Sequence, residues 1–214
     1  MASGGPPYYG RWSVNDVYEA ILDGTWVAAT PEGDGDATDA ALMMVPTSIA
    51  YTGTSASIGA NGSVEFSAVS SLSLNGVFSA DYDNYMVLIR HVASGGNTLF
   101  YKLRSGGSDT STGYAHQWVL ADNTAIQANR QTSQTASLFG DCMTTATGHT
   151  LYFYGPNLPQ PTAARSIGVE PRSAGLRLID FGSTQSANTQ FDGLTILPTT
   201  VNLTGRIAVY GMRK

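Results

Sequence analysis

Apolar and polar residues alternate along most of the chain beyond Pro46, as they do in half-buried β-strands. Val64, Phe66 and Ala68 show this pattern, with polar neighbours between them. Asn61-Gly62 and Asn75-Gly76 predict tight turns. Further strands are predicted at 72–74, 85–89, 98–104, 114–120, 136–139, 150–154, 166–170, 176–181, 194–197 and 206–210.

No helix-length segment separates these short strands, which makes a parallel sheet with crossover helices a poor fit. Many short strands with turn signals between them favour an antiparallel sandwich or barrel. We therefore expect an all-β fold, most simply a jelly-roll-like β-sandwich. The order of the strands does not follow from their periodicity.

Near the start of the chain, apolar residues recur at the spacing of an α-helix and not at every second position. This pattern predicts one short amphipathic helix at 13–23. Ser13 can cap its N-terminus, with Asp16 as a short-armed capping-box partner. Gly24 follows as a C-terminal stop. The apolar positions repeat at helical spacing on one face, namely Val14, Val17, Tyr18, Ile21 and Leu22.

These two patterns divide the chain into a segment at 1–46 and a β-domain at 47–214. Met1 to Pro7 holds two glycines and two prolines, which predicts an extended arm ahead of the helix. A stretch rich in glycine and aspartate from Pro31 to Asp39 reads as a linker. The first segment is thus an arm, a helix and a linker.

Charged residues are scarce, at 13% of the 214 residues, where about 25% is usual. Lysine occurs only at Lys102 and Lys214, and the formal net charge is -5, so the sequence shows no cluster of basic residues that could bind nucleic acid. A neutral polar surface is poorly protected against association. We expect other subunits, identical or different, to cover part of it.

Membrane insertion and export by a signal peptide are not expected. No apolar run approaches the roughly 20 residues that cross a bilayer, and no charged-then-apolar segment opens the chain. Cys142 is the single cysteine, so an intrachain disulfide is impossible.

Four stretches resemble small β-rich virion proteins of tailed bacteriophages, of the tail-fibre, minor-tail or capsid-decoration type. They are Gly10-Arg-Trp-Ser-Val-Asn-Asp-Val-Tyr-Glu-Ala, Tyr82-Asp-Asn-Tyr85, Phe191-Asp-Gly-Leu-Thr-Ile-Leu-Pro198 and Leu203-Thr-Gly-Arg-Ile-Ala-Val-Tyr-Gly-Met-Arg213. The resemblance implies a place in the phage particle, homotrimeric assembly and an N-terminal segment that docks while the β-domain projects. Synthesis would take place in the host cytoplasm.

The helix and its aromatic neighbours form the expected virion-anchor interface, because a short isolated helix is marginal and its apolar face needs a partner. Packing of this face on the chain's own sandwich is the alternative. The anchor residues are Tyr8, Tyr9, Trp12, Val17, Tyr18, Ile21 and Trp26.

The residues that could carry catalysis or bind a metal lack a recognisable pattern. His91, His116 and His149 are too far apart for a paired metal-ligand spacing, and Cys142 has no protease signature around it. Asp83, Asp180 and Asp192 are conceivable carbohydrate-cleaving acids near strand ends. We expect no catalytic residues, no metal and no cofactor.

Two further groups of residues have a functional and a structural interpretation. Asp34, Asp36 and Asp39 suggest part of a calcium loop, but Val45 stands where the bidentate glutamate belongs, which favours a solvated linker. Tyr82-Asp-Asn-Tyr85 and Trp118 could form a sugar-stacking surface, although a turn and a packed strand residue explain them better.

Together these observations predict a non-enzymatic phage structural protein, a tail fibre or minor tail protein that attaches to the host through the β-domain. A capsid decoration or head-fibre protein is the alternative, and a carbohydrate-active tailspike domain is third. The expected partners are further copies of the chain, other virion proteins and a host-surface glycan or receptor.

Overall fold

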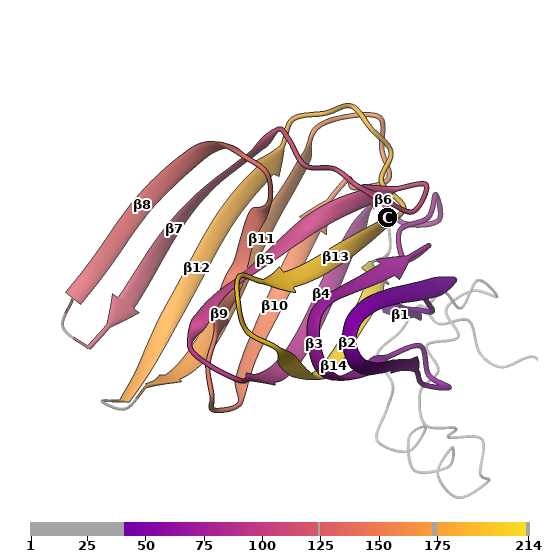
Figure 1. Ribbon diagram of the computed structural model, residues 1–214. Helices are drawn as coiled ribbons and strands as arrows, with labels where there is room; N and C mark the ends of the chain where they lie inside the picture. Colours follow the sequence, from indigo (N-terminus) through magenta and orange to yellow (C-terminus); the bar gives the residue numbers. More distant parts are fainter. Residues whose placement is uncertain (1–40, 124, 173–174, 213–214) are drawn as a thin grey trace, which may run out of the picture. The chain divides into compact units, whose positions relative to one another are not determined.

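The computed structural model describes residues 41–123, 125–172 and 175–212, and this part of the chain is all β (Figure 1). Every strand pair is antiparallel, which confirms the predicted class. The strands are β1 (Ala41–Met44), β2 (Ser48–Ile58), β3 (Val64–Asn75), β4 (Asn84–Ala93), β5 (Asn97–Ser105), β6 (Ser108–Asp109), β7 (Tyr114–Asp122), β8 (Ala125–Gln134), β9 (Ser137–Cys142), β10 (Thr147–Tyr154), β11 (Thr162–Arg172), β12 (Gly175–Gln185), β13 (Gly193–Pro198) and β14 (Leu203–Met212).

One sheet joins all of these strands and curls back over itself. From β3 it runs through β14, β4, β10, β11, β12 and β7 to β8, and in the other direction through β13 to β5. β9 pairs with β5 and also contacts β10, β11 and β12, so this end of the sheet folds over the middle strands (Figure 1). The result is a two-layered arrangement with a core between the layers.

The curl begins in the middle of β3. Its first half pairs with β14 and its second half with β13. At the bend Ala68 has a positive φ of 47°, and Gly53 on β2 lies against it. A Cβ on Gly53 would stand 2.2 Å from the Ala68 carbonyl oxygen, so only glycine allows the two strands to turn together.

Large apolar and aromatic side chains from both layers fill the core. Tyr101 on β5 packs edge-on against Phe153 on β10, with 5.1 Å between ring centroids. Its hydroxyl lies 2.7 Å from that of Ser183 on β12, which satisfies the one polar atom of this buried ring. Tyr101 thus fastens the two layers to each other at their centre.

The sequence predictions for the β-domain can be compared with the strands directly. Each predicted strand falls on an observed one, whereas β1, β2, β6 and β8 were not predicted. β1 pairs with β14, which places 41–44 in the sheet although the predicted boundary follows Pro46.

The predicted arm, linker and helix at 13–23 lie outside the described residues. So do the aspartates at 34, 36 and 39 and every anchor residue, namely Tyr8, Tyr9, Trp12, Val17, Tyr18, Ile21 and Trp26. Within the described ranges there is no helix, and hence none long and apolar enough to span a membrane.

Candidate functional site

The buried face of the sheet brings together two histidines that are distant in the sequence. His91 on β4 and His149 on β10 stack with 5.5 Å between ring centroids. Gly140 and Gly168 lie against the His149 ring, where a Cβ on either would come within 2.3 Å of it. The ring fits only because both neighbours lack a side chain.

Burial makes this pair unfavourable to protonate. It lowers the pKa of His91 to about 4, with a further contribution from the positive charge that His149 would carry. Burial also lowers the pKa of His149. Neither ring nitrogen of His91 has a hydrogen-bond partner among the described residues, and no group of ligating side chains there could hold a metal ion. The pair is therefore an uncharged part of the core.

Next to the histidines lies an ionic network that joins the two layers. Glu170 on β11 is completely buried and accepts hydrogen bonds from Arg172 and Arg177, at 2.9 and 2.7 Å from their Nη2 atoms. Its second oxygen accepts the backbone N–H of Asp141 on β9 at 3.0 Å. The Asp141 carboxylate binds the same two arginines.

The network pairs two carboxylates with two arginines, but at Glu170 burial outweighs the effect of this pairing. Burial and the nearby Asp141 carboxylate raise the pKa of Glu170 to about 7, while Arg177 acts in the opposite direction. All partners of Glu170 are protein groups from β9, β11 and β12. Such an arrangement fixes the layers against each other.

The other candidates for chemistry are dispersed. Burial raises the pKa of the Cys142 thiol to about 12, which makes it a poor nucleophile. Asp180 lies in the middle of β12, not at a strand end, and is paired with Arg165. Asp192 precedes β13 and accepts the Gly106 N–H, while Asp83 precedes β4.

Trp118 and Tyr85 are packed residues, as the structural interpretation predicted. Tyr85 is fully buried, and its hydroxyl donates to the carbonyl oxygen of Ser79 at 2.7 Å, which closes the turn before β4. Trp118 is half-buried against a small cluster of Leu120, Leu138, Ile179, Phe181 and Phe100.

The outer face of β11, β12, β7 and β8 has the opposite character, because large apolar side chains lie exposed on it. Cross-strand pairing aligns Val169 with Leu178, and Ala121 with both Leu178 and Ile126. Ile126 is 78% exposed. We call this group the apolar patch; it consists of Val119, Ile126, Ile167, Val169, Leu176 and Leu178, each at least 42% exposed.

A hollow adjoins the apolar patch on the same face, centred on Gly182 of β12. Gly182 pairs with Arg165 on one side and Gln117 on the other, while Asp180 and Thr184 precede and follow it on the same face. The hollow is shallow and open to solvent, with a volume of about 430 Å³, and a Cβ at Gly182 would meet no atom within 4 Å.

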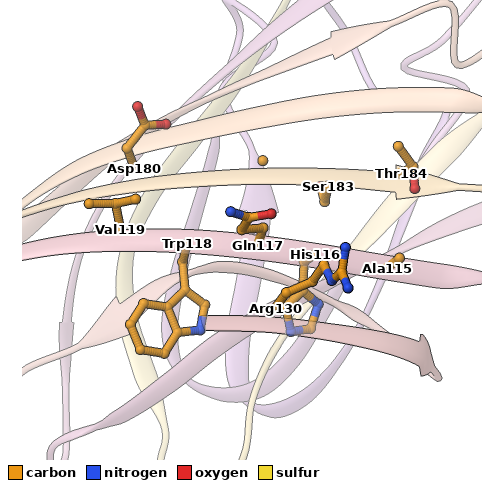
Figure 2. A pocket seen from close by; sticks show the side chains of 10 residues that line it. Ala115, His116, Gln117, Trp118, Val119, Arg130, Asp180, Ser183 and Thr184 are labelled. Carbon is orange, nitrogen blue, oxygen red and sulfur yellow. The ribbon is translucent and has the colours of Figure 1, made fainter. Parts of the chain in front are cut away.

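Figure 2 shows how side chains line this hollow. Gln117, Asp180 and Thr184 lie on one side of the strands, and His116 and Trp118 point to the other. Arg165 holds Asp180 with two hydrogen bonds, of 3.0 Å from Nε and 2.6 Å from Nη2. The lining combines the Arg130 guanidinium, the Asp180 carboxylate, the Gln117 amide and the Thr184 hydroxyl, and of these four only Asp180 was a candidate in the sequence analysis.

No family model matches the sequence, and no curated protein matches it either. Among solved structures, the binding domain of botulinum neurotoxin serotype G is similar over 77% of this chain and 43% of that chain, with 10% identity and a TM-score of 0.21. This chain thus spans less than half of that one, and the likeness is too low to carry an argument about fold or function.

Proposed function

We propose that this chain is a non-enzymatic structural protein of a tailed-phage particle, a tail fibre or minor tail protein that assembles with copies of itself and presents its β-domain to the host. The observation that supports this role most is the apolar patch on the outer sheet face. In this proposal the curled sheet is a jelly-roll-like sandwich, and the N-terminal arm and helix attach it to other virion proteins.

The apolar patch suits contact with a second copy of the chain. Single exposed apolar residues are common, but contiguous patches on monomers rarely exceed about 300–600 Å². The six side chains are 42–78% exposed, and the patch reaches β8, which lies at the end of the sheet and offers as well a strand edge that pairs with no other described strand. Arg165 and Asp180 form an ion pair beside the patch and neutralise each other, so this pair adds no net charge that would oppose a like surface.

The expected assembly is a homotrimer, and substitutions in the apolar patch test it. The double variant Val169→Asp/Leu178→Asp is expected to convert the assembly to monomers, because burying two carboxylates between subunits is costly. The measurement is the molar mass of the full chain by light scattering. Ser55→Asp, an exposed change on β2 outside the apolar patch, is the control. A monomeric parent protein would contradict the proposal.

The number of copies per particle tests the virion location and separates two roles. We expect the ratio to the major capsid protein, by quantitative mass spectrometry of purified particles, to be in the low tens of copies or fewer. A ratio comparable to the capsid protein would instead establish a capsid decoration or head-fibre protein. Absence from the particle would overturn the virion assignment altogether.

A carbohydrate-active tailspike domain is the third candidate and the weakest. Asp180, the only one of its suggested acids on the outer face beside the hollow, is neutralised by Arg165. Release of sugar from a host envelope preparation by the purified chain would revive this candidate.

A further inference from the structure

Two arginines with no acidic partner among the described residues lie side by side on the outer face of the sheet. Arg206 on β14 and Arg90 on β4 are direct cross-strand partners, and both are exposed. We propose that this pair binds a phosphate group, either as inorganic phosphate or in the phosphomonoester of a small molecule. The site goes beyond the proposed role in the phage particle and does not rest on it.

Arg90 and Arg206 differ from most arginines in the described part of the chain, which are held in ion pairs. The paired ones are Arg104, Arg165, Arg172 and Arg177. Among the described residues, Arg90 has no side-chain hydrogen bond, and Arg206 has one, from Nη2 to the Ser63 hydroxyl at 2.7 Å. Like charges on directly opposed residues destabilise a sheet, and an anion bound between them would remove that cost.

Glu65 is the acidic residue beside the pair, and it does not neutralise it. It lies on β3 opposite Arg206, on the side away from Arg90. Its side chain is exposed and forms no ion pair with any described residue. Two positive charges thus stand against one negative charge, although the formal net charge of the whole chain is -5.

A hollow beside the two arginines gives a ligand room to reach them. It lies over β2, β3, β14 and β4, is open to solvent and has a volume of about 610 Å³. Sites for small ligands have volumes of roughly 300–1,000 Å³. Both arginines line the hollow, and so do the hydroxyl groups of Ser57, Ser67 and Thr204.

The hydroxyl groups add hydrogen-bond donors to the two guanidinium groups. Thr204 Oγ1 accepts the Ala68 N–H at 3.0 Å, which leaves its own hydrogen available to a ligand. Ala68 has a positive φ and lies at the bulge where the pairing of β14 with β3 shifts, so the bulge sets the position of Thr204. The hydroxyls of Ser57 and Ser67 have no hydrogen-bond partner among the described residues.

Two guanidinium groups on neighbouring strands suit a tetrahedral dianion better than a carboxylate. A guanidinium binds carboxylate or phosphate oxygens through two parallel hydrogen bonds. A carboxylate has one charge and two oxygens in one plane, which a single arginine already satisfies. A phosphate group has oxygens that point toward both arginines, and it carries close to two negative charges at neutral pH.

The site is separate from the surface that a second copy of the chain would cover. No residue of the apolar patch lies on β2, β3, β14 or β4. In the sheet, β10 lies between β4 and β11, which is the nearest strand with a patch residue (Figure 1). The patch can therefore be covered while the two arginines stay open to solvent.

The test is an NMR titration of the purified full chain in a phosphate-free buffer of low ionic strength at neutral pH. The ligands are inorganic phosphate, glycerol 3-phosphate and, for comparison, acetate. We expect a dissociation constant in the millimolar range or below for phosphate or its monoester, and binding of acetate that is weaker by roughly tenfold or more. The tighter of the two phosphate ligands identifies the source of the group, whereas equal binding of acetate would contradict the inference.

Three substitutions test the residues. Arg90→Gln and Arg206→Gln should each weaken phosphate binding by roughly tenfold or more, because each removes a charged donor. Glu65→Gln should strengthen it severalfold, because Glu65 is the only acidic side chain in the lining. All three side chains are exposed, so the melting temperature without phosphate should not fall.

Arg130→Gln is the matched control. Arg130 is also exposed and also forms no ion pair with a described residue, but it lies on β8. This variant changes the net charge by the same amount as Arg90→Gln, and it should bind phosphate like the parent protein.

Three further results would overturn the inference. The first is no binding of phosphate or glycerol 3-phosphate at millimolar concentration, and the second is binding that Arg90→Gln and Arg206→Gln leave unchanged. The third is an equal loss in Arg130→Gln and Arg90→Gln, which would show only a general attraction of anions to positive charge. None of these results depends on particles, so a failure here is distinct from failure of the virion assignment, which the copy number decides.

Discussion

Replacing Glu170 with alanine (Glu170→Ala) is expected to lower the free energy of unfolding by about 3–5 kcal/mol. The variant removes a completely buried carboxylate and leaves Arg172 and Arg177 with Asp141 as their remaining acidic partner among the described residues. It also leaves the Asp141 N–H without its acceptor. Urea unfolding at neutral pH, followed by circular dichroism, measures the loss.

Asp180→Ala is the matched control, because it removes a carboxylate that is also held by two arginine hydrogen bonds, but at the surface. Solvent screens such a pair, and its loss should cost no more than about 1 kcal/mol. Glu170→Gln, which keeps the shape and part of the hydrogen bonding, should lie between the two. If Glu170→Ala and Asp180→Ala lowered the free energy of unfolding equally, the buried network would stabilise the fold no more than the surface ion pair does.

Acid is expected to destabilise the β-domain through His91. Its pKa is about 4 in the folded chain against about 6.5 for a free histidine, so the unfolded chain takes up the proton first as the pH falls. The contribution of His91 to stability is therefore complete above about pH 6.5 and declines toward pH 4, by roughly 3 kcal/mol in total. Unfolding free energies between pH 7.5 and pH 4 measure it.

His91→Phe separates this effect from the other groups that titrate nearby. It keeps a ring against His149 and removes two nitrogen atoms that have no partner in the described part of the chain. Glu170, whose pKa is raised, contributes with the opposite sign but does so in both proteins. The variant should lose less stability in acid than the parent, and parallel pH profiles would refute the role of His91. His91→Leu serves if the larger ring does not fit.

The strands that were predicted and those that were missed differ in one physical property. β4 alternates buried and exposed positions along its length, and that alternation is visible in the sequence. β8 is exposed on both faces at nearly every position, and β2 is mostly exposed and composed of small or polar residues. Because such a strand has no buried face, apolar residues do not recur at every second position in its sequence. It forms only because it pairs with a neighbouring strand.

The sequence by itself determined the class of fold, the positions of the core strands and the packed roles of Tyr85 and Trp118, because each follows from local periodicity, turn chemistry and composition. Only the tertiary structure decided which side chains meet. His91 joins His149, Asp141 joins Glu170 and Gly182 opens a hollow between Arg165 and Gln117 because strand order and register set these neighbours. Register depends on pairing between distant segments, and a single-sequence pattern does not encode it.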